Sequence, residues 1–245
     1  MANPTSHDIR TDQGTLPGLL WLPDGDAAGP GVVVVQEIFG LSNYMVQRCQ
    51  DLADLGYAVL APQLFARLDP PREQVADTVE VSEMLEEGMA LTQALNWDRA
   101  VSDVVAALQD LRGMDGVDAV GVMGFCYGGG VAFNASAQAN AQGAAPEALV
   151  SFYGSALPTL LLLAGQVQVP SFHAFGTADS FLPMEQVERI RDAVTEGGSR
   201  DDVVFELHEG AGHAFDNPHP AFHHEEASRE AWRQATSFLA RFLPV

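Results

Sequence analysis

Four consecutive valines, in the stretch PGVVVVQEIFG at residues 30–40, limit the folds that this chain can adopt. A strand with one face in water alternates apolar and polar residues, whereas an unbroken apolar run predicts a strand that is buried on both faces. Such strands are typical of parallel sheets, which helices cover on both sides. The run therefore favours an α/β architecture.

The other segments alternate between strand and helix patterns, as a mostly parallel sheet requires. Strands are predicted at residues 14–23 (a strand or a hairpin), 30–40, 57–65, 118–125, 146–154, 169–176 and 202–210. Helices are predicted at residues 42–56, 98–114, 131–139, 183–198 and 223–243, with a loop and one or two helices outside the sheet at 66–97. Ser42 and Asp98 are the expected N-caps. No proline- or glycine-rich linker divides the chain, so we predict a single domain over residues 1–245 with about seven or eight strands.

The formal net charge of −21, with 12 basic residues that are all arginine, restricts the partners that the chain can bind. An acidic surface repels nucleic-acid backbones and anionic membranes, so neither is an expected partner. No apolar run approaches the roughly 20 residues of a membrane helix, and the first residues lack a secretory signal pattern. The two cysteines, Cys49 and Cys126, do not indicate a disulfide framework. We therefore expect a cytoplasmic monomer that acts on a small molecule.

Chemically reactive side chains follow several of the predicted strands. Functional residues gather at the carboxyl ends of strands in doubly wound sheets, and Glu37, Cys126, Asp179 and His213 all stand at such ends. The residues around Cys126, GFCYG, have the spacing of the nucleophile elbow G-x-S-x-G, with sulfur in place of oxygen. A helix that begins behind the cysteine would favour its thiolate. The alternative interpretation is a small buried cysteine at a glycine-rich helix start.

His213 and Asp179 strengthen the interpretation of Cys126 as a nucleophile. His213 lies in the loop sequence EGAGHAF and Asp179 in FGTADSF, each just after a predicted strand. A single loop histidine is usually solvated, and a single aspartate in such a sequence usually forms a turn or caps a helix. The chain order of nucleophile, acid and histidine is, however, the order of the α/β-hydrolase triad. Three such residues at three strand ends therefore predict nucleophilic catalysis.

Five motifs, taken together, resemble those of the dienelactone hydrolase family of α/β-hydrolases over nearly the whole chain. They are, in order, QEIFGL (36–41), GFCYGG (124–129), FYG (152–154), GTAD (176–179) and AGHAF (211–215). The resemblance implies an α/β-hydrolase fold, a catalytic triad of Cys126, His213 and Asp179, and hydrolysis of an ester or lactone without a cofactor. It also implies that Glu37 pairs with the resting thiol and moves aside when substrate binds.

Each predicted site residue has an expected role. Cys126 would attack the carbonyl to form a thioester, His213 would transfer protons, and Asp179 would orient the imidazole ring. The two backbone N–H donors of an oxyanion hole are expected from Tyr127, the residue after the nucleophile, and from Ile38, in the loop after the valine strand.

Glu37 directly follows an apolar strand, so its carboxylate should be partly desolvated and its pKa raised. The alternative interpretation is a salt bridge between this glutamate and a nearby arginine.

One position departs from the family pattern in a way that bears on the substrate. The family's namesake substrate carries a carboxylate held by arginines, and one of these stands four residues after the catalytic histidine, where this chain has Asn217. A second lies between the third strand and the helix before the elbow, but Arg67 and Arg72 do not stand at the expected distance from Glu37 or Cys126.

A substrate carboxylate in a partly dry pocket is poorly compensated without a guanidinium, and Asp216 would repel it further. We therefore expect a neutral or differently shaped ester. The candidates for substrate contact are Tyr153, Trp97, Asn217 and Arg72, although aromatic residues at such places are as often part of the core.

Other functions fit the sequence less well. His219 and His223 would share a helix face only if Pro220 did not interrupt it, and there is no HExxH or thiolate pair, so no metal site is predicted. The glycine-rich stretch GFCYGGG lacks the lysine and hydroxyl residue of a phosphate-binding loop. A thioesterase or acyl transferase with the same groups remains open, as does a non-catalytic binding protein of the same fold.

Overall fold

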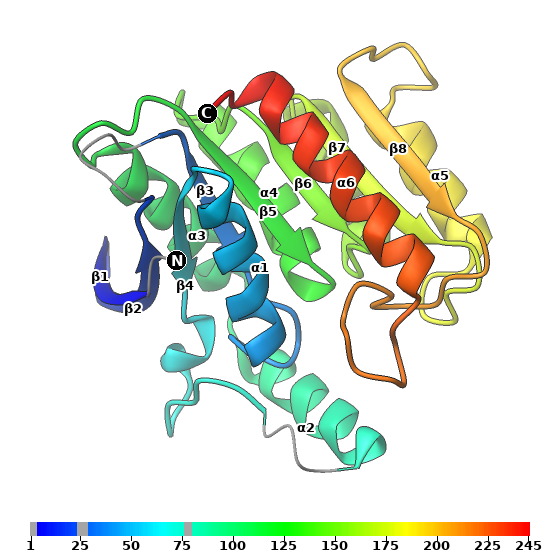
Figure 1. The fold of residues 1–245 in the computed structure, drawn as a ribbon, viewed down its shortest axis with the longest axis horizontal. Helices are drawn as coiled ribbons and strands as arrows, with labels where there is room; N and C mark the ends of the chain where they lie inside the picture. Colours follow the sequence, from blue (N-terminus) through cyan, green and yellow to red (C-terminus); the bar gives the residue numbers. More distant parts are fainter. Residues whose placement is uncertain (1–3, 24–28, 76–79) are drawn as a thin grey trace.

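The computed structural model describes residues 4–23, 29–75 and 80–245, and it contains one eight-stranded sheet (Figure 1). The strand order is β1-β2-β4-β3-β5-β6-β7-β8. The strands are β1 (Thr5–Thr11), β2 (Gly14–Trp21), β3 (Gly31–Val35), β4 (Ala58–Pro62), β5 (Val120–Phe125), β6 (Leu149–Phe152), β7 (Ser171–Gly176) and β8 (Val203–His208). The first two strands pair antiparallel at one edge, and β4, β3, β5, β6, β7 and β8 run parallel. The predicted α/β-hydrolase type of fold, with a mostly parallel sheet, is therefore confirmed.

Helices cover both faces of this sheet (Figure 1). They are α1 (Asn43–Asp54), α2 (Val81–Ala94), α3 (Trp97–Arg112), α4 (Tyr127–Ala141), α5 (Met184–Val194) and α6 (Glu225–Phe242), with short 3-10 helices at Leu64–Arg67, Leu157–Thr159 and Leu161–Gln166. The core on one face includes residues of α3, α4 and α5, and the core on the other includes residues of α1 and α6.

The valine run in β3 supplies both cores. Val33 and Val35 belong to the core under α3 and α4, whereas Val32 and Val34 belong to the core under α1 and α6, and all four are fully buried. Successive side chains of a strand point to opposite faces, so only a strand covered on both sides places every residue in an apolar environment. The strand predicted from this run is confirmed.

The N-terminal edge of the sheet differs from the prediction. The strand β1 was not predicted, and it pairs with β2 from Thr5↔Leu20 to Thr11↔Gly14 as the outer arm of a hairpin. Only Ile9 of its residues is fully buried, so this edge strand carries no run of apolar residues that would reveal it.

Two helix starts also differ in detail. Helix α3 begins at Trp97, and its cap is Asn96, whose Oδ1 accepts a hydrogen bond from Arg99 N at 2.9 Å, rather than Asp98. Ser42 occupies the N-cap position of α1, but its hydroxyl makes no capping hydrogen bond. Helix α2 lies outside the sheet, in the stretch where the sequence predicts such a helix (Figure 1).

None of the helices in the described residues combines the length and the apolar character needed to cross a membrane.

Candidate active site

Cys126 occupies the sharp turn between β5 and α4. Its backbone dihedral angles are φ 52° and ψ −116°, a conformation that L-residues rarely adopt. The turn also needs glycine on both sides of the cysteine. A Cβ at Gly124 would lie 2.1 Å from the carbonyl oxygen of Gly128, and a Cβ at Gly128 would lie 2.3 Å from that of Val35. The GxCxG spacing is therefore imposed by the close approach of three backbone segments.

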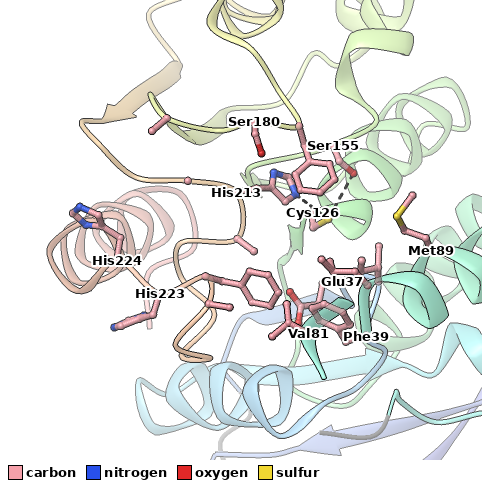
Figure 2. A pocket seen from close by; sticks show the side chains of 18 of the residues that line it. Glu37, Phe39, Val81, Met89, Cys126, Ser155, Ser180, His213, His223 and His224 are labelled. Carbon is pink, nitrogen blue, oxygen red and sulfur yellow. Dashed lines mark hydrogen bonds between the residues drawn. The ribbon is translucent and has the colours of Figure 1, made fainter. Parts of the chain in front are cut away.

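His213 and Asp179 are brought to this cysteine by the loops after β8 and β7. The Nε2 atom of His213 lies 3.2 Å from Cys126 Sγ, and its Nδ1 atom lies 2.7 Å from Asp179 Oδ2 (Figure 2 shows the first contact). The other carboxylate oxygen of Asp179 accepts hydrogen bonds from the backbone N–H groups of Phe181 and Leu182, at 2.8 and 3.0 Å. These bonds fix the carboxylate, which in turn fixes the imidazole ring.

The cysteine and histidine favour opposite charges. Burial opposes ionisation of Cys126, but the His213 charge and hydrogen bonds from His213, Ser155 and the Tyr127 backbone outweigh it and lower the pKa of the thiol below its usual range. Burial also opposes the charged form of His213, yet the thiolate and Asp179 raise the pKa of the imidazole to about 10. Both pKa shifts favour the thiolate of Cys126 and the imidazolium of His213.

Glu37 lies in the same pocket, two residues after the end of β3, and is 1% exposed. The Nδ2 atom of Asn217 donates to its Oε1 at 2.8 Å, and Asn217 Oδ1 accepts from His219 N at 2.9 Å, so the amide is held by both ends. Burial, followed by the charge of Cys126, raises the pKa of Glu37 well above its usual value. The raised pKa that the sequence predicts agrees with this direction.

Two expectations about the partner of Glu37 differ from the structure. The cysteine contacts His213 rather than Glu37, so the glutamate–thiol pair implied by the family resemblance is absent from this arrangement. The alternative of an arginine salt bridge is also wrong, because Arg48, on the neighbouring helix α1, binds Asp216 instead.

Asp216 does not face the pocket, which corrects the expectation that it would repel a substrate carboxylate. Its side chain is fully buried and accepts hydrogen bonds from Arg48 Nε and Nη2 at 2.8 and 2.6 Å, from Tyr44 Oη at 2.6 Å and from Ser228 Oγ at 2.7 Å. The negative charge is therefore compensated beneath the loop that carries His213 and Asn217.

The pocket above these groups has a volume of about 640 Å³, within the usual range for small-molecule sites. Cys126, His213 and Glu37 form one part of its lining (Figure 2). Ile38 also lines the pocket. Apolar side chains supply most of the rest, namely Phe39, Val81, Leu85, Met89, Ala178, Phe181, Ala214, Ala221 and Phe222.

The four predicted substrate-contact residues lie outside this lining. Tyr153 is fully buried, with its ring edge-on to that of His213 at 5.4 Å between centroids. Trp97 packs edge-on against the Tyr127 ring at 5.5 Å, and Arg72 is exposed, 3.9 Å from Glu87. Asn217 does not line the pocket, but it donates a hydrogen bond to Glu37, which does. In this structure the four residues support the site or lie away from it.

Sequence reasoning missed several residues of the pocket. Ser155 Oγ lies 3.7 Å from the sulfur, just after the FYG motif at the end of β6, so the strand-end rule could have found it. Phe181, in the loop after β7, could have been found by the same rule. The α2 residues gave no such signal, because nothing in their sequence shows which face of the helix borders the site.

No group of three or more His, Cys, Asp or Glu side chains within the described ranges is arranged to hold a metal ion. His223 lines the pocket, whereas His219 Nδ1 accepts a hydrogen bond from the backbone N–H of Ala221 at 3.2 Å.

Comparison with known proteins identifies relatives over most of the chain. Residues 16–243 match the family model described as the Dienelactone hydrolase family. The carboxymethylenebutenolidase of Pseudomonas putida is 30% identical over 222 residues, which cover 87% of this chain and 86% of that protein.

Solved structures share the fold at lower identity. A dienelactone hydrolase-like promiscuous phosphotriesterase from metagenomic libraries superposes with a TM-score of 0.77 at 24% identity, over 99% of both chains. The dienelactone hydrolase of Anabaena variabilis superposes with a TM-score of 0.68 at 18% identity, again over 99% of both chains.

Proposed function

The chain belongs to the dienelactone hydrolase family of carboxylic ester hydrolases, and we propose that it cleaves a small ester or lactone through a thioester on Cys126. Cys126 is the nucleophile of this proposal, His213 transfers the protons, and Asp179 orients and stabilises the imidazolium.

A single observation carries the proposal. A cysteine held at a strained elbow lies 3.2 Å from a histidine that lies 2.7 Å from a buried carboxylate, and the sulfur and the imidazole line an apolar pocket. A cysteine that served only for packing would need neither the strained backbone nor an aligned histidine.

In the first half of the reaction, the thiolate attacks the substrate carbonyl and a carbon–sulfur bond forms. The negative charge that develops on the carbonyl oxygen is stabilised by the backbone N–H groups of Tyr127, which hydrogen-bonds toward the sulfur in the free protein, and of Ile38, which lines the pocket. As the tetrahedral intermediate collapses, the carbon–oxygen bond of the ester breaks. Imidazolium His213 gives its proton to the leaving alcohol oxygen.

In the second half, neutral His213 removes a proton from water, and the resulting hydroxide attacks the thioester. The carbon–sulfur bond breaks, the acid is released and the thiolate returns beside the imidazolium. Water is the only co-reactant, so no cofactor is needed.

Glu37 has a supporting role in this proposal. Burial raises its pKa, which favours the protonated carboxyl and so disfavours a second negative charge beside the thiolate. Its hydrogen bond to Asn217 keeps the carboxyl off the sulfur, which leaves the thiol free to pair with His213. Glu37 is therefore a positioning residue here, with Asn217 where the family resemblance places an arginine.

The test is hydrolysis of 4-nitrophenyl butyrate followed on the millisecond scale. We expect a burst of nitrophenol equal to the enzyme concentration, followed by slower turnover, if deacylation is the slower step. Prior treatment with iodoacetamide and the change Cys126→Ala should each abolish burst and turnover. Full activity in His213→Ala would contradict the proposal.

A further inference from the structure

One face of helix α2 is apolar and borders the candidate active site. Val81, Leu85 and Met89 are spaced by four residues, so they lie one above another on the same side of the helix, and all three line the pocket. The helix approaches the site closely, because a Cβ at Gly88 would lie 2.9 Å from the carbonyl oxygen of Ile38.

Aromatic side chains continue this apolar surface around the pocket. Phe39 and Phe222 stack with 5.9 Å between ring centroids, and the Phe181 ring lies 5.2 Å from that of His213. Two of these lining residues expose large areas to solvent, with Met89 45% exposed and Phe181 56% exposed. Exposed apolar side chains that border a pocket indicate a surface that an apolar ligand covers.

No arginine or lysine stands among the described residues that line the pocket. Arg72, the arginine at the α2 side, lies 3.9 Å from Glu87 of the same helix and is not part of the lining. Apart from Cys126, His213 and Glu37, the titratable lining residues are His223 and His224. The formal net charge of −21 adds to the repulsion of any anionic ligand.

The position of His213 decides which part of an ester meets α2. His213 must reach the leaving oxygen to protonate it, so the alcohol part lies on the histidine side of the sulfur. Figure 2 shows His213 and Met89 on opposite sides of Cys126. The acyl part of the substrate therefore extends toward α2.

We infer that the apolar face of α2 is the acyl-chain site, and that it selects esters with an uncharged acyl group of about four to eight carbons. This inference rests on the proposed thioester mechanism and adds the substrate class to it. The residues that determine the specificity are Val81, Leu85 and Met89, which do not take part in the chemical steps.

The first test is an acyl series of 4-nitrophenyl esters from acetate to octanoate. These esters share one leaving group, so differences in kcat/KM report acyl binding. Complete burial of a methylene group is worth about 0.8 kcal/mol, which corresponds to about fourfold in kcat/KM. We expect a rise of about two- to fourfold per methylene up to hexanoate, and Leu85→Ala should reduce the hexanoate-to-acetate ratio about tenfold.

The second test compares hexanoate with the 4-nitrophenyl monoester of adipate, which has the same number of acyl carbons and a terminal carboxylate. We expect a kcat/KM at least about 50-fold lower for the adipate ester. The change Met89→Arg should raise the adipate value at least about tenfold and lower the hexanoate value. Leu162→Arg, at a position 95% exposed and outside the pocket lining, is the matched control and should change neither value.

The outcomes separate the two proposals. A rising acyl series with reversal by Met89→Arg supports the inference. A flat acyl series, or equal rates with adipate and hexanoate, would overturn the inference while hydrolysis that depends on Cys126 still supports the proposed function. Absence of Cys126-dependent hydrolysis with every ester would overturn the proposed function, and the acyl-chain site with it.

Discussion

Two walls of the pocket differ in construction. The wall to which we assign the chemistry, called the catalytic wall below, is formed by Cys126, His213 and Glu37, and the α2 wall is formed by Val81, Leu85 and Met89. Each side chain of the catalytic wall follows a strand of the central sheet and has a hydrogen-bond partner. The α2 wall belongs to a helix outside the sheet, whose buried Met84 forms a small apolar cluster with Phe39 and Val75.

This difference separates two properties of a hydrolase. Catalysis needs groups held within a fraction of an ångström, and strand ends with close backbone packing provide such positions. Selectivity for an apolar group needs only area and shape, which a peripheral helix can supply. We therefore expect changes in the catalytic wall to affect the chemical steps and changes in the α2 wall to affect the choice of substrate.

The largest effect is expected from Asp179→Asn. The amide can still accept the two backbone hydrogen bonds, but it removes the charge that stabilises imidazolium His213. We expect kcat to fall about 10³- to 10⁴-fold with little change in KM. Steady-state kinetics with 4-nitrophenyl hexanoate provide the measurement. A loss below tenfold would show that the aspartate is not part of the machinery.

The ionisation of Cys126 gives the next largest effect. The lowered thiol pKa means that thiolate, and with it reactivity, persists below the usual range and is lost as the pH falls through that lowered value. Alkylation by iodoacetamide at pH 6 should therefore be fast, and about 100-fold slower in His213→Ala. Cys49 serves as an internal control, because it is fully buried and its thiol pKa is raised by burial. Equal rates in the two proteins would contradict the thiolate–imidazolium pair.

Ester hydrolysis should also decline at high pH. Above a pH of about 10 His213 loses the proton that the leaving group requires, so kcat/KM should fall there as well as at low pH.

The sequence indicated which residues would lie together in the catalytic wall, because strand ends, glycine spacing and motif order are local features. The central strand β3 and the turn at Cys126 followed from the valine run and from the glycines. The hydrogen bond of Asn217 to Glu37 and the burial of Asp216 under Arg48 depend on contacts across about 170 to 180 positions of the chain, which no local pattern encodes. The orientation of α2, with its apolar face toward the pocket, likewise depends on tertiary contacts that no local pattern encodes.

A stability measurement compares the support beneath the two walls. In Arg48→Met, the buried Asp216 loses its positive partner under the loop of His213, and we expect the free energy of unfolding to fall by about 3 kcal/mol. Denaturant titration measures this free energy. Arg233→Met, which removes an exposed arginine paired with Glu230, is the matched control and should leave the transition unchanged.

The smallest effect on stability is expected from Leu85→Ala in the α2 wall. Leu85 is only partly buried, so its truncation should cost about 1 kcal/mol or less. Hydrolysis of 4-nitrophenyl acetate, with its dependence on Asp179, should persist in this variant. A loss as large as that of Arg48→Met would show that α2 is part of the structural core, and the contrast between the walls would not hold.

The most direct measurement is the location of the acyl group after acid quenching within one turnover. The protein is mixed with 4-nitrophenyl hexanoate, quenched, digested and analysed by mass spectrometry. We expect one hexanoyl group as a thioester on Cys126, removed by neutral hydroxylamine. An acyl group on Ser155, or a nitrophenol burst without any acylated residue, would contradict this expectation.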